Sequence, residues 1–229
     1  MLDAASIIAF ERSGRFSYSM IESFRQNNSV FSYIISERTD AGVFLEEDPE
    51  PERATFVSGN YFSELGVNAV QGRAVYDHNA QPGAPPVVVL SHRYWQRRFG
   101  SDPGVVGRVL RLNGKPVEVA GIAPPNFTGL SSQPTSRQPA LWFPMTVHPF
   151  LFPNSQALTS FAQRDTEMYA ALKAGVSLEA ANDQLISLAT ELQKQYPDQI
   201  EMRPQAAGTG RPDLSAQPPL CLPHSGYSG

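Results

Sequence analysis

The dipeptide Asn113-Gly114, set between two apolar stretches, constrains the fold of this 229-residue chain more than any other short feature. Both residue types tolerate positive φ, which a two-residue type I′ turn requires at both of its positions. Pro116 comes at the start of the second stretch, where its missing N–H group is tolerated. We therefore predict a β-hairpin over residues 108–122. Its apolar positions are Val109, Leu110, Leu112, Val117, Val119 and Ile122.

Five further segments are predicted to be strands, because they are rich in β-branched and aromatic residues or alternate in polarity. They are residues 30–35, 54–58, 87–90, 141–145 and 166–172. The run at 87–90 is short and continuously apolar, which favours a strand buried on both faces. We interpret 141–145 as a short strand or an extended edge.

Four helical segments are predicted from apolar spacing and from end signals. They are residues 18–26, ended by Asn27-Asn28; one turn within 60–66; 93–99, capped by Ser91 and closed by Gly100; and a long helix that Ser177 caps and Pro197 stops. The long helix carries an apolar stripe of Leu178, Ala181, Leu185, Leu188 and Leu192. Strands and helices together indicate a mixed, loop-rich domain.

Composition excludes several classes of protein. The 18 basic and 22 acidic side chains leave a net charge of −4, so no basic field exists for general nucleic-acid binding. A single cysteine, Cys221, can form neither an internal disulfide nor a thiolate metal site. No apolar run approaches the ~20 residues that cross a bilayer, and the start of the chain shows no signal peptide. We expect a soluble domain that inserts no segment of its own into a membrane.

Nucleophilic, metal and cofactor chemistry find no support in the motifs. Ser91 and His92 are adjacent, but no G-x-S-x-G elbow surrounds the serine, and its place before a helix explains it as a cap. Gly114-Lys115 lacks the flanking residues of a phosphate-binding loop. Cys221 lies in a tail and is a poor candidate nucleophile. The histidines are scattered without an H-x-x-x-H pair: His78, His92, His148 and His224. We therefore predict no catalytic, cofactor-binding or metal-binding residues.

Charged clusters are interpreted as solvated surface. The acidic run at 46–52 contains two prolines, which break the alternating oxygen ligands of a calcium loop. Asp77 and Asp102 could pair as catalytic carboxylates, although we expect no such role. Trp95 and Trp142 are predicted to be core residues rather than binding platforms. Five arginines could meet an acidic partner or anionic headgroups, but we favour the interpretation that they form solvated helix and hairpin faces: Arg93, Arg97, Arg98, Arg108 and Arg111.

Longer motifs point to a family. Residues 57–67, VSGNYFSELGV, followed by QGR at 71–73, resemble the "VSGNYF–x–LGV–x–GR" segment of the MacB-like periplasmic core domain. Residues 86–127 follow the family pattern from PVVVLSHRYW to GIAPPNF. The opening helix at 16–31 and the strand-to-helix junction at 172–181 also agree, with Ala174 where proline is usual. The amino-acid sequence of these motifs is most similar to that of the duplicated, ATPase-less permeases related to MacB and FtsX.

The resemblance implies an α+β fold in two lobes. A discontinuous β-α-β porter-like lobe would use both ends of the segment, and a smaller, mainly β lobe would be inserted near residues 60–150. We therefore divide the chain into an N-terminal segment at 1–13, the core domain at 14–203 and a tail at 204–229. The tail is rich in Pro, Gly, Ser and Ala without periodicity, so we interpret it as disordered.

The resemblance also implies a role in a membrane machine. In such permeases this domain lies on the periplasmic side of the inner membrane, between the first transmembrane helix and the others. It transmits movement from those helices, in transport or efflux, and in MacB it contacts a periplasmic adaptor protein. The implied partners are permease helices, an ABC ATPase subunit and such an adaptor. The domain carries no catalytic residues and no cofactor.

The sequence departs from the family in lacking the flanking membrane helices, and residues 206–229 do not resemble the family's continuation. One hypothesis is therefore a truncated reading frame or gene fragment, with a tail that is out of frame. A second is a free-standing soluble interaction domain of the cell envelope. A third, a hydrolase, would require Ser91, His92 and a carboxylate to converge in one pocket.

Overall fold

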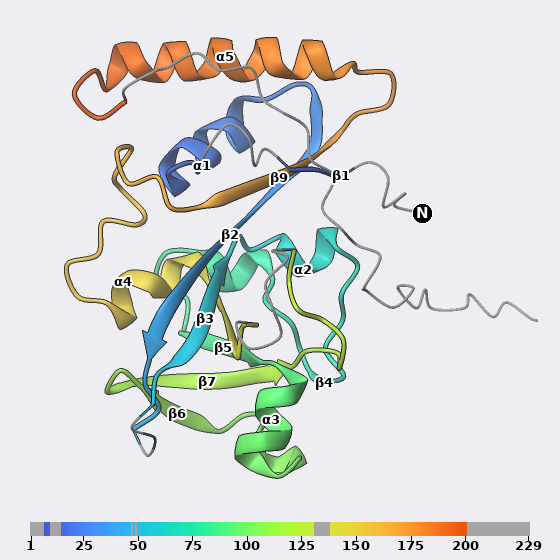
Figure 1. Cartoon of the computed structure of the whole chain (residues 1–229), viewed down its shortest axis with the longest axis vertical. Coiled ribbons are helices and arrows are strands. Elements are labelled where there is room, and N and C mark those ends of the chain that lie inside the picture. The colour runs from blue at the N-terminus through green and yellow to red at the C-terminus, as the bar shows by residue number, and fades with distance from the viewer. Residues whose placement is uncertain (1–6, 10–14, 47, 49, 131–137, 201–229) are drawn as a thin grey trace, which may run out of the picture.

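A computed structural model describes residues 7–9, 15–46, 48, 50–130 and 138–200 (Figure 1). Within them, nine strands form one mixed sheet in the order β1-β9-β2-β3-β8-β5-β7-β4, and β6 pairs with β7. The strands are β1 (Ile7–Ala9), β2 (Phe31–Val43), β3 (Glu52–Val57), β4 (Gln71–Gly72), β5 (Val87–Leu90), β6 (Val109–Leu112), β7 (Lys115–Ile122), β8 (Leu141–Pro144) and β9 (Glu167–Leu172). The α+β class is confirmed.

Five α-helices and three short 3-10 helices accompany the sheet in the described part of the chain. The α-helices are α1 (Tyr18–Asn27), α2 (Tyr61–Glu64), α3 (His92–Phe99), α4 (His148–Leu151) and α5 (Leu178–Gln195). The 3-10 helices are η3 (Asp77–Ala80), η4 (Pro103–Val105) and η6 (Met145–Val147). Serine hydroxyls cap the three longest helices, since the Oγ atoms of Ser17, Ser91 and Ser177 accept N–H groups of the first turn.

The two ends of the described chain build one end of the molecule. β1 and β2 both pair antiparallel with β9, so they run parallel to each other with β9 between them and α1 connecting them. This arrangement is a split β-α-β unit. Figure 1 shows α1 and α5 at this end, and the hairpin β6–β7 and α3 at the opposite end.

β2 links these two ends of the molecule. It pairs with β9 from Phe31 to Glu37 and with β3 from Glu37 to Val43, so Glu37 takes part in both registers. Its thirteen residues extend roughly 40 Å at ~3.3 Å per residue. The sheet therefore continues from the helical end to the hairpin end through a single long strand.

Side chains alternate between the two faces of β2 and β9, as they do in any strand. Ile34, Met168 and Ala170 belong to the cluster that α1 and α5 cover. Ile35 and Tyr169 face the other way and join a second cluster, to which α2 contributes Tyr61 and Phe62. The helices therefore cover only one face here, and the central part of the chain covers the other.

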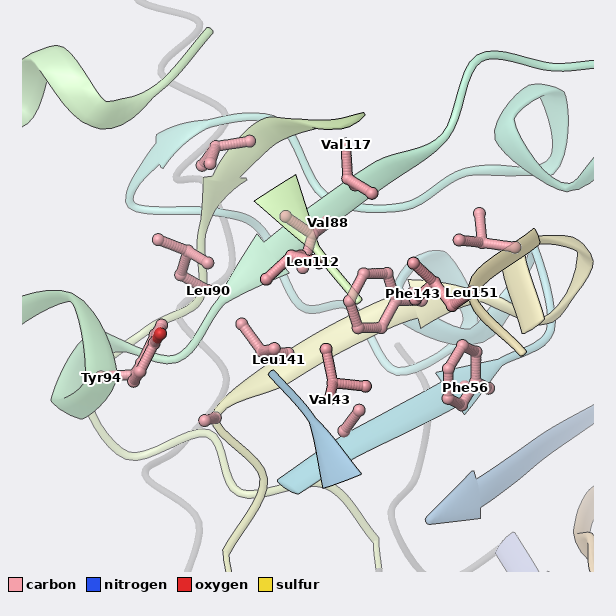
Figure 2. Close-up of a cluster of buried hydrophobic side chains, with 14 of the residues drawn as sticks. Val43, Phe56, Val88, Leu90, Tyr94, Leu112, Val117, Leu141, Phe143 and Leu151 are labelled. Atoms are coloured by element: carbon pink, nitrogen blue, oxygen red, sulfur yellow. The ribbon is translucent and has the colours of Figure 1, made fainter. Parts of the chain in front are cut away.

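The central strand β5 is buried on both faces, as its sequence predicted. Val87 and Val89 belong to the cluster that contains α2, whereas Val88 and Leu90 point into a third cluster (Figure 2). In the third cluster Leu90 and Tyr94 lie at one end and Phe56 at the other, with β8 side chains between them. The strand therefore contributes to two cores at once.

The predicted hairpin is confirmed. Asn113 and Gly114 have φ values of 50° and 70°, and Leu112 pairs with Lys115 across the two-residue turn. The Asn113 side chain has a further contact that the hairpin pattern did not predict. Its Oδ1 accepts the Phe44 N–H group at 2.9 Å, and its backbone N–H donates to Phe44 O at 2.9 Å. The turn therefore also holds the distal end of β2.

Three local predictions need correction. Residues 141–145 are not an edge, because β8 lies between β3 and β5 with all four residues buried. Asn28 does not end α1 in the left-handed conformation: its φ is −84°, and its side chain instead bonds Arg25 O and the Phe31 N–H group. Strand 30–35 continues to Val43, because contacts with distant residues satisfy its polar side chains.

The domain boundaries remain predictions. Residues 1–6, 10–14 and 201–229 lie outside the described residues, and with them the tail, Cys221 and His224. The division into two lobes, with the inserted one near 60–150, likewise stays a prediction. No helix within the described ranges is long and apolar enough to cross a bilayer.

Candidate functional site: the junction of β2 with the central segment

Three polar residues of the VSGNYF motif contact β2: Ser58, Asn60 and Tyr61. Ser58 donates its N–H to Ser36 O at 3.0 Å and accepts the Ser36 N–H on Oγ at 3.1 Å. The Asn60 side chain donates Nδ2–H to Ile34 O at 3.0 Å. Both side chains are buried, so these bonds replace water on backbone groups that would otherwise be costly to bury. The motif is thus an anchor of the central segment on β2.

The third contact joins Tyr61 to Glu37 of β2, and the Glu37 residue is only 2% exposed. Its Oε2 is bonded to the Tyr61 hydroxyl, and the Leu130 N–H lies 3.4 Å from the same oxygen and 3.2 Å from the Tyr61 hydroxyl. Its Oε1 lies 3.3 Å from the Tyr169 hydroxyl, which is 2.9 Å from Glu167 Oε2. We call Glu37, Tyr61, Leu130, Glu167 and Tyr169 the Glu37 cluster.

The Glu37 cluster brings together four separate parts of the chain: β2, α2, the loop before β8, and β9. Glu37 and Glu167 are directly opposite each other in the β2–β9 register. Like charges at such a pair repel. Glu37 therefore lies opposite a second carboxylate, although burying even one negative charge at this position costs free energy.

Burial is the main reason that the pKa of Glu37 is raised from its ordinary 4.5 to about 7, and the Glu167 charge raises it further. Hydrogen bonds from Tyr61, Leu130 and Tyr169 oppose the rise. Burial, and next the Glu37 charge, also raise the pKa values of Tyr61 and Tyr169 far above their ordinary range. Both phenols therefore remain protonated donors.

Gly129 allows the chain to approach this cluster. Its φ is +86°, and a Cβ there would lie 3.4 Å from Glu37 Oε2 and 3.9 Å from the Nε1 of Trp142. Trp142 is fully buried, and its Nε1–H has no partner among the described residues. The prediction that Trp142 is a core residue fits this placement, and its indole and the Glu37 carboxyl both border Gly129.

The arginine cluster and the acidic run, which are separate in sequence, meet at the hairpin end. Arg97 pairs with Glu52, Arg98 lies 3.8 Å from Asp48, and Arg111 lies 3.4 Å from Glu46. Arg108 pairs within its own loop with Asp102 at 2.7 Å. We call Arg97, Arg98, Arg108 and Arg111 the arginine surface. It is largely solvated, as predicted, but its acidic partners come from this chain.

The serine and carboxylate candidates for catalysis have structural partners instead. Ser91 Oγ accepts the Tyr94 N–H at 3.0 Å as a helix cap. Asp102 accepts the Gly104 N–H at 2.9 Å and binds Arg108, whereas Asp77 faces Arg25 at 3.9 Å. Each aspartate thus faces an arginine.

Two of the histidines, His92 and His148, and Lys115 likewise have structural contacts. His92 packs edge-on against Trp95, and His148 bonds Ser155 at 2.7 Å. Lys115 lies over the Phe150 ring. In the described ranges, no three His, Cys, Asp or Glu side chains converge as a metal site.

One polar cleft lies near Ser91. It has a volume of about 280 Å³, and arginines and prolines line it, among them Arg53, Arg93, Pro51 and Pro139. Arg97 on its wall is already paired with Glu52. The cleft therefore brings Ser91 and His92 to a shared surface, but the serine hydroxyl is engaged as a cap there.

Solved structures share this fold at low sequence identity. The periplasmic region of MacB from Actinobacillus actinomycetemcomitans superposes with a TM-score of 0.60, at 14% identity over 86% of each chain. A domain of a putative permease protein from Porphyromonas gingivalis gives 0.60 at 18% identity, over 85% of this chain and 86% of that one. The extracellular domain of the noncanonic ABC-type transporter YknZ from Gram-positive bacteria gives 0.53 at 14%, over 88% and 97%.

The sequence itself decides the assignment, because the family model of the MacB-like periplasmic core domain matches residues 3–188. This chain belongs to that family. The expected resemblance, fold class and permease affiliation are confirmed. A search among curated proteins finds no match.

The structure gives the MacB-like family motif a physical meaning. In the QGR part, Gly72 has φ +69° and pairs with Gly121, and a Cβ on Gly72 would lie 2.2 Å from Ala120 O. No residue with a side chain fits there without moving the backbone.

In the VSGNYF part of the family motif, three polar side chains bind β2, as described above. Phe62 fills the core beside them.

Sequence reasoning missed the Glu37 cluster altogether. Glu37 lies in a polar stretch, Ser-Glu-Arg-Thr-Asp, where a predicted strand had already ended. Its partners are 24, 93 and 132 positions away, so no local pattern connects them. One usable signal was Tyr61 inside the family motif, because a tyrosine in an apolar cluster must bond its hydroxyl to something.

Proposed function

We propose that this domain lies on the periplasmic side of a MacB/FtsX-type permease and carries conformational change between membrane helices at its helical end and a protein partner at its hairpin end. It performs no catalysis of its own. The observation that carries the proposal is the continuity of the sheet. β2 pairs with β9 at one end and β3 at the other, so a movement at either end is mechanically connected to the other.

The positions of the chain ends support this assignment. β1 and residues 196–200, which follow α5, both lie at the helical end (Figure 1). In the permeases of this family, the domain is joined to membrane helices on both sides of its sequence. The central segment reaches β2 through the contacts of Ser58, Asn60 and Tyr61. These contacts are the joint through which movement would pass to α3 and the hairpin.

The non-catalytic role rests on the engagement of the candidate nucleophile and acids. Ser91 serves as a cap, and Asp102 is bound to Arg108. The partner surface is the hairpin end, where charged side chains stand in a mixed-sign array. Such arrays favour electrostatic selection of a partner over tight apolar binding.

The test uses a chimeric permease in which residues 3–200, which include all of α5, replace the native domain of a MacB/FtsX-type permease, with transport and ATP hydrolysis measured together. Asn60→Ala removes the bond to Ile34 O and loosens the joint. We expect transport per ATP hydrolysed to fall severalfold at unchanged membrane abundance. Gln81→Ala removes an exposed side-chain amide bond, to Asp77 O, away from the joint and the partner surface; it is the matched control and should leave the ratio intact. Equal ratios for both variants would refute transmission through the joint.

A further inference from the structure

Proton counting at the Glu37 cluster shows that its bonds are complete in only one protonation state. The Tyr169 hydroxyl has one proton and lies between two carboxylates, 2.9 Å from Glu167 Oε2 and 3.3 Å from Glu37 Oε1. A phenol donates one hydrogen bond. With Glu37 neutral, the shorter distance assigns that proton to Glu167, and the phenol oxygen is then free to accept from Glu37 Oε1.

A neutral Glu37 satisfies every group. Its Oε2 accepts from Tyr61, and a proton on Oε1 donates to the oxygen of Tyr169. The Leu130 N–H then has its acceptors at the Tyr61 and Glu37 oxygens. An ionised Glu37 instead competes with Glu167 for the single Tyr169 proton, so one of two facing carboxylates loses its donor.

In the described part of the chain, no positively charged side chain is among the groups that bond the carboxyl of Glu37 or most strongly shift the pKa of Glu37. β3 faces it with Val57, α2 with Tyr61, and β9 with Glu167 and Tyr169. β8 brings Trp142 toward the same loop. Two arginines of this region pair with other carboxylates, since Arg15 lies 3.4 Å from Glu167 and Arg38 2.9 Å from Asp165.

We propose that the Glu37 cluster is a proton-operated latch: with Glu37 neutral it holds residues 58–61 and 129–130 on β2 and β9, and ionisation of Glu37 releases them. The raised pKa of Glu37, about 7, would place the change near neutrality. This proposal rests only on the geometry of this chain, and it does not depend on whether the domain carries movement in a permease.

The first test measures amide hydrogen exchange at Leu130 by NMR, corrected for the intrinsic effect of pH, in the full chain. Between about pH 5.5 and 8.5 we expect the corrected exchange of Leu130 to rise at least about tenfold in the native protein. Val119, whose N–H donates to Arg108 O in the hairpin, serves as the reference amide and should change little.

Glu37→Gln is the matched variant, because its amide accepts from Tyr61 and donates to Tyr169 as a neutral Glu37 would. In this variant we expect the corrected exchange of Leu130 to be independent of pH. Glu118→Gln, at an exposed carboxylate on β7, should behave as the native protein does. Equal pH dependence in native protein and Glu37→Gln would overturn the latch.

A second set of measurements does not need Glu37→Gln to fold. Carbon-13 NMR of the glutamate carboxyl groups follows Glu37 directly in the native protein, and we expect a titration midpoint near 7. Trp142 fluorescence in a Trp95→Phe background, which leaves Trp142 as the single tryptophan, should shift with the same midpoint. A carboxyl midpoint in the ordinary glutamate range would overturn the proposal.

Discussion

The Glu37 cluster and the arginine surface are both made of charged and polar side chains, yet they differ in what they do for the fold. Glu37 is 2% exposed, so its charge has almost no water to stabilise it. Arg111 and Glu46 are more than half exposed, and water screens their attraction. Loss of a polar partner should therefore destabilise the fold strongly in the Glu37 cluster, and only weakly in the arginine surface.

The pH dependence of stability should show the largest difference between the regions. Because the pKa of Glu37 rises from 4.5 to about 7 on folding, the folded state binds more protons than the unfolded state between these values. The free energy of unfolding should therefore fall as pH rises through this window, by at most about 3 kcal/mol. Urea denaturation at about pH 5 and pH 8 measures the change. Glu37→Gln should abolish it, and an unchanged fall in that variant would contradict the assignment.

Tyr61→Phe should cost about 1–2 kcal/mol near pH 5, because neutral Glu37 then loses the closest donor that holds residues 58–61 on β2. The cost should be smaller near pH 8, where ionisation of Glu37 has already released this contact. Tyr94→Phe is the control, since none of the described residues bonds the buried Tyr94 hydroxyl; we expect it to change the free energy of unfolding by less than about 0.5 kcal/mol. Similar losses in both variants would argue against a special role for the cluster.

Gly114→Val tests the hairpin that carries part of the arginine surface. Gly114 has φ +70° with open space around it, so only backbone strain opposes a side chain. We expect a loss of about 1–3 kcal/mol in a thermal melt. Lys115→Val places the same side chain one residue later, in extended strand, and should cost less. A melt unaffected by Gly114→Val would refute the type I′ turn.

Arg111→Ala should have the smallest effect, below about 0.5 kcal/mol, because its pair with Glu46 is exposed. The difference from the native protein should vanish at about 1 M salt, where the Debye length is ~3 Å. A loss that persists at high salt would show that the arginine surface is more deeply coupled to the fold than its exposure indicates.

Local chemistry explains which parts of the fold could be predicted. The Asn113-Gly114 turn, the Ser91 and Ser177 caps and the doubly buried run at 87–90 each depend on neighbouring residues alone. Their physics acts within a few residues, so a sequence displays it directly.

Non-local contacts explain what could not be predicted. The second half of β2 is polar, and it continues as strand only because β3, Asn113 and the Glu37 cluster supply partners. The central position of β8 follows from pairing with β3 and β5, which no local pattern encodes. The family motif located the joint region, but only the structure shows that Tyr61 meets Glu37.

The way β2 is shared between β3 and β9 also sets an order on folding during synthesis. β3 follows β2 by a short connection, whereas Tyr169 is 132 residues beyond Glu37. At ribosomal rates of ~5–20 residues per second, Glu37 is made roughly ten seconds before Tyr169. During that interval one edge of β2 has no β9 to pair with. The nascent domain therefore exposes an open strand edge beside an acidic side chain, and negative charge at such an edge discourages the wrong chain from pairing there.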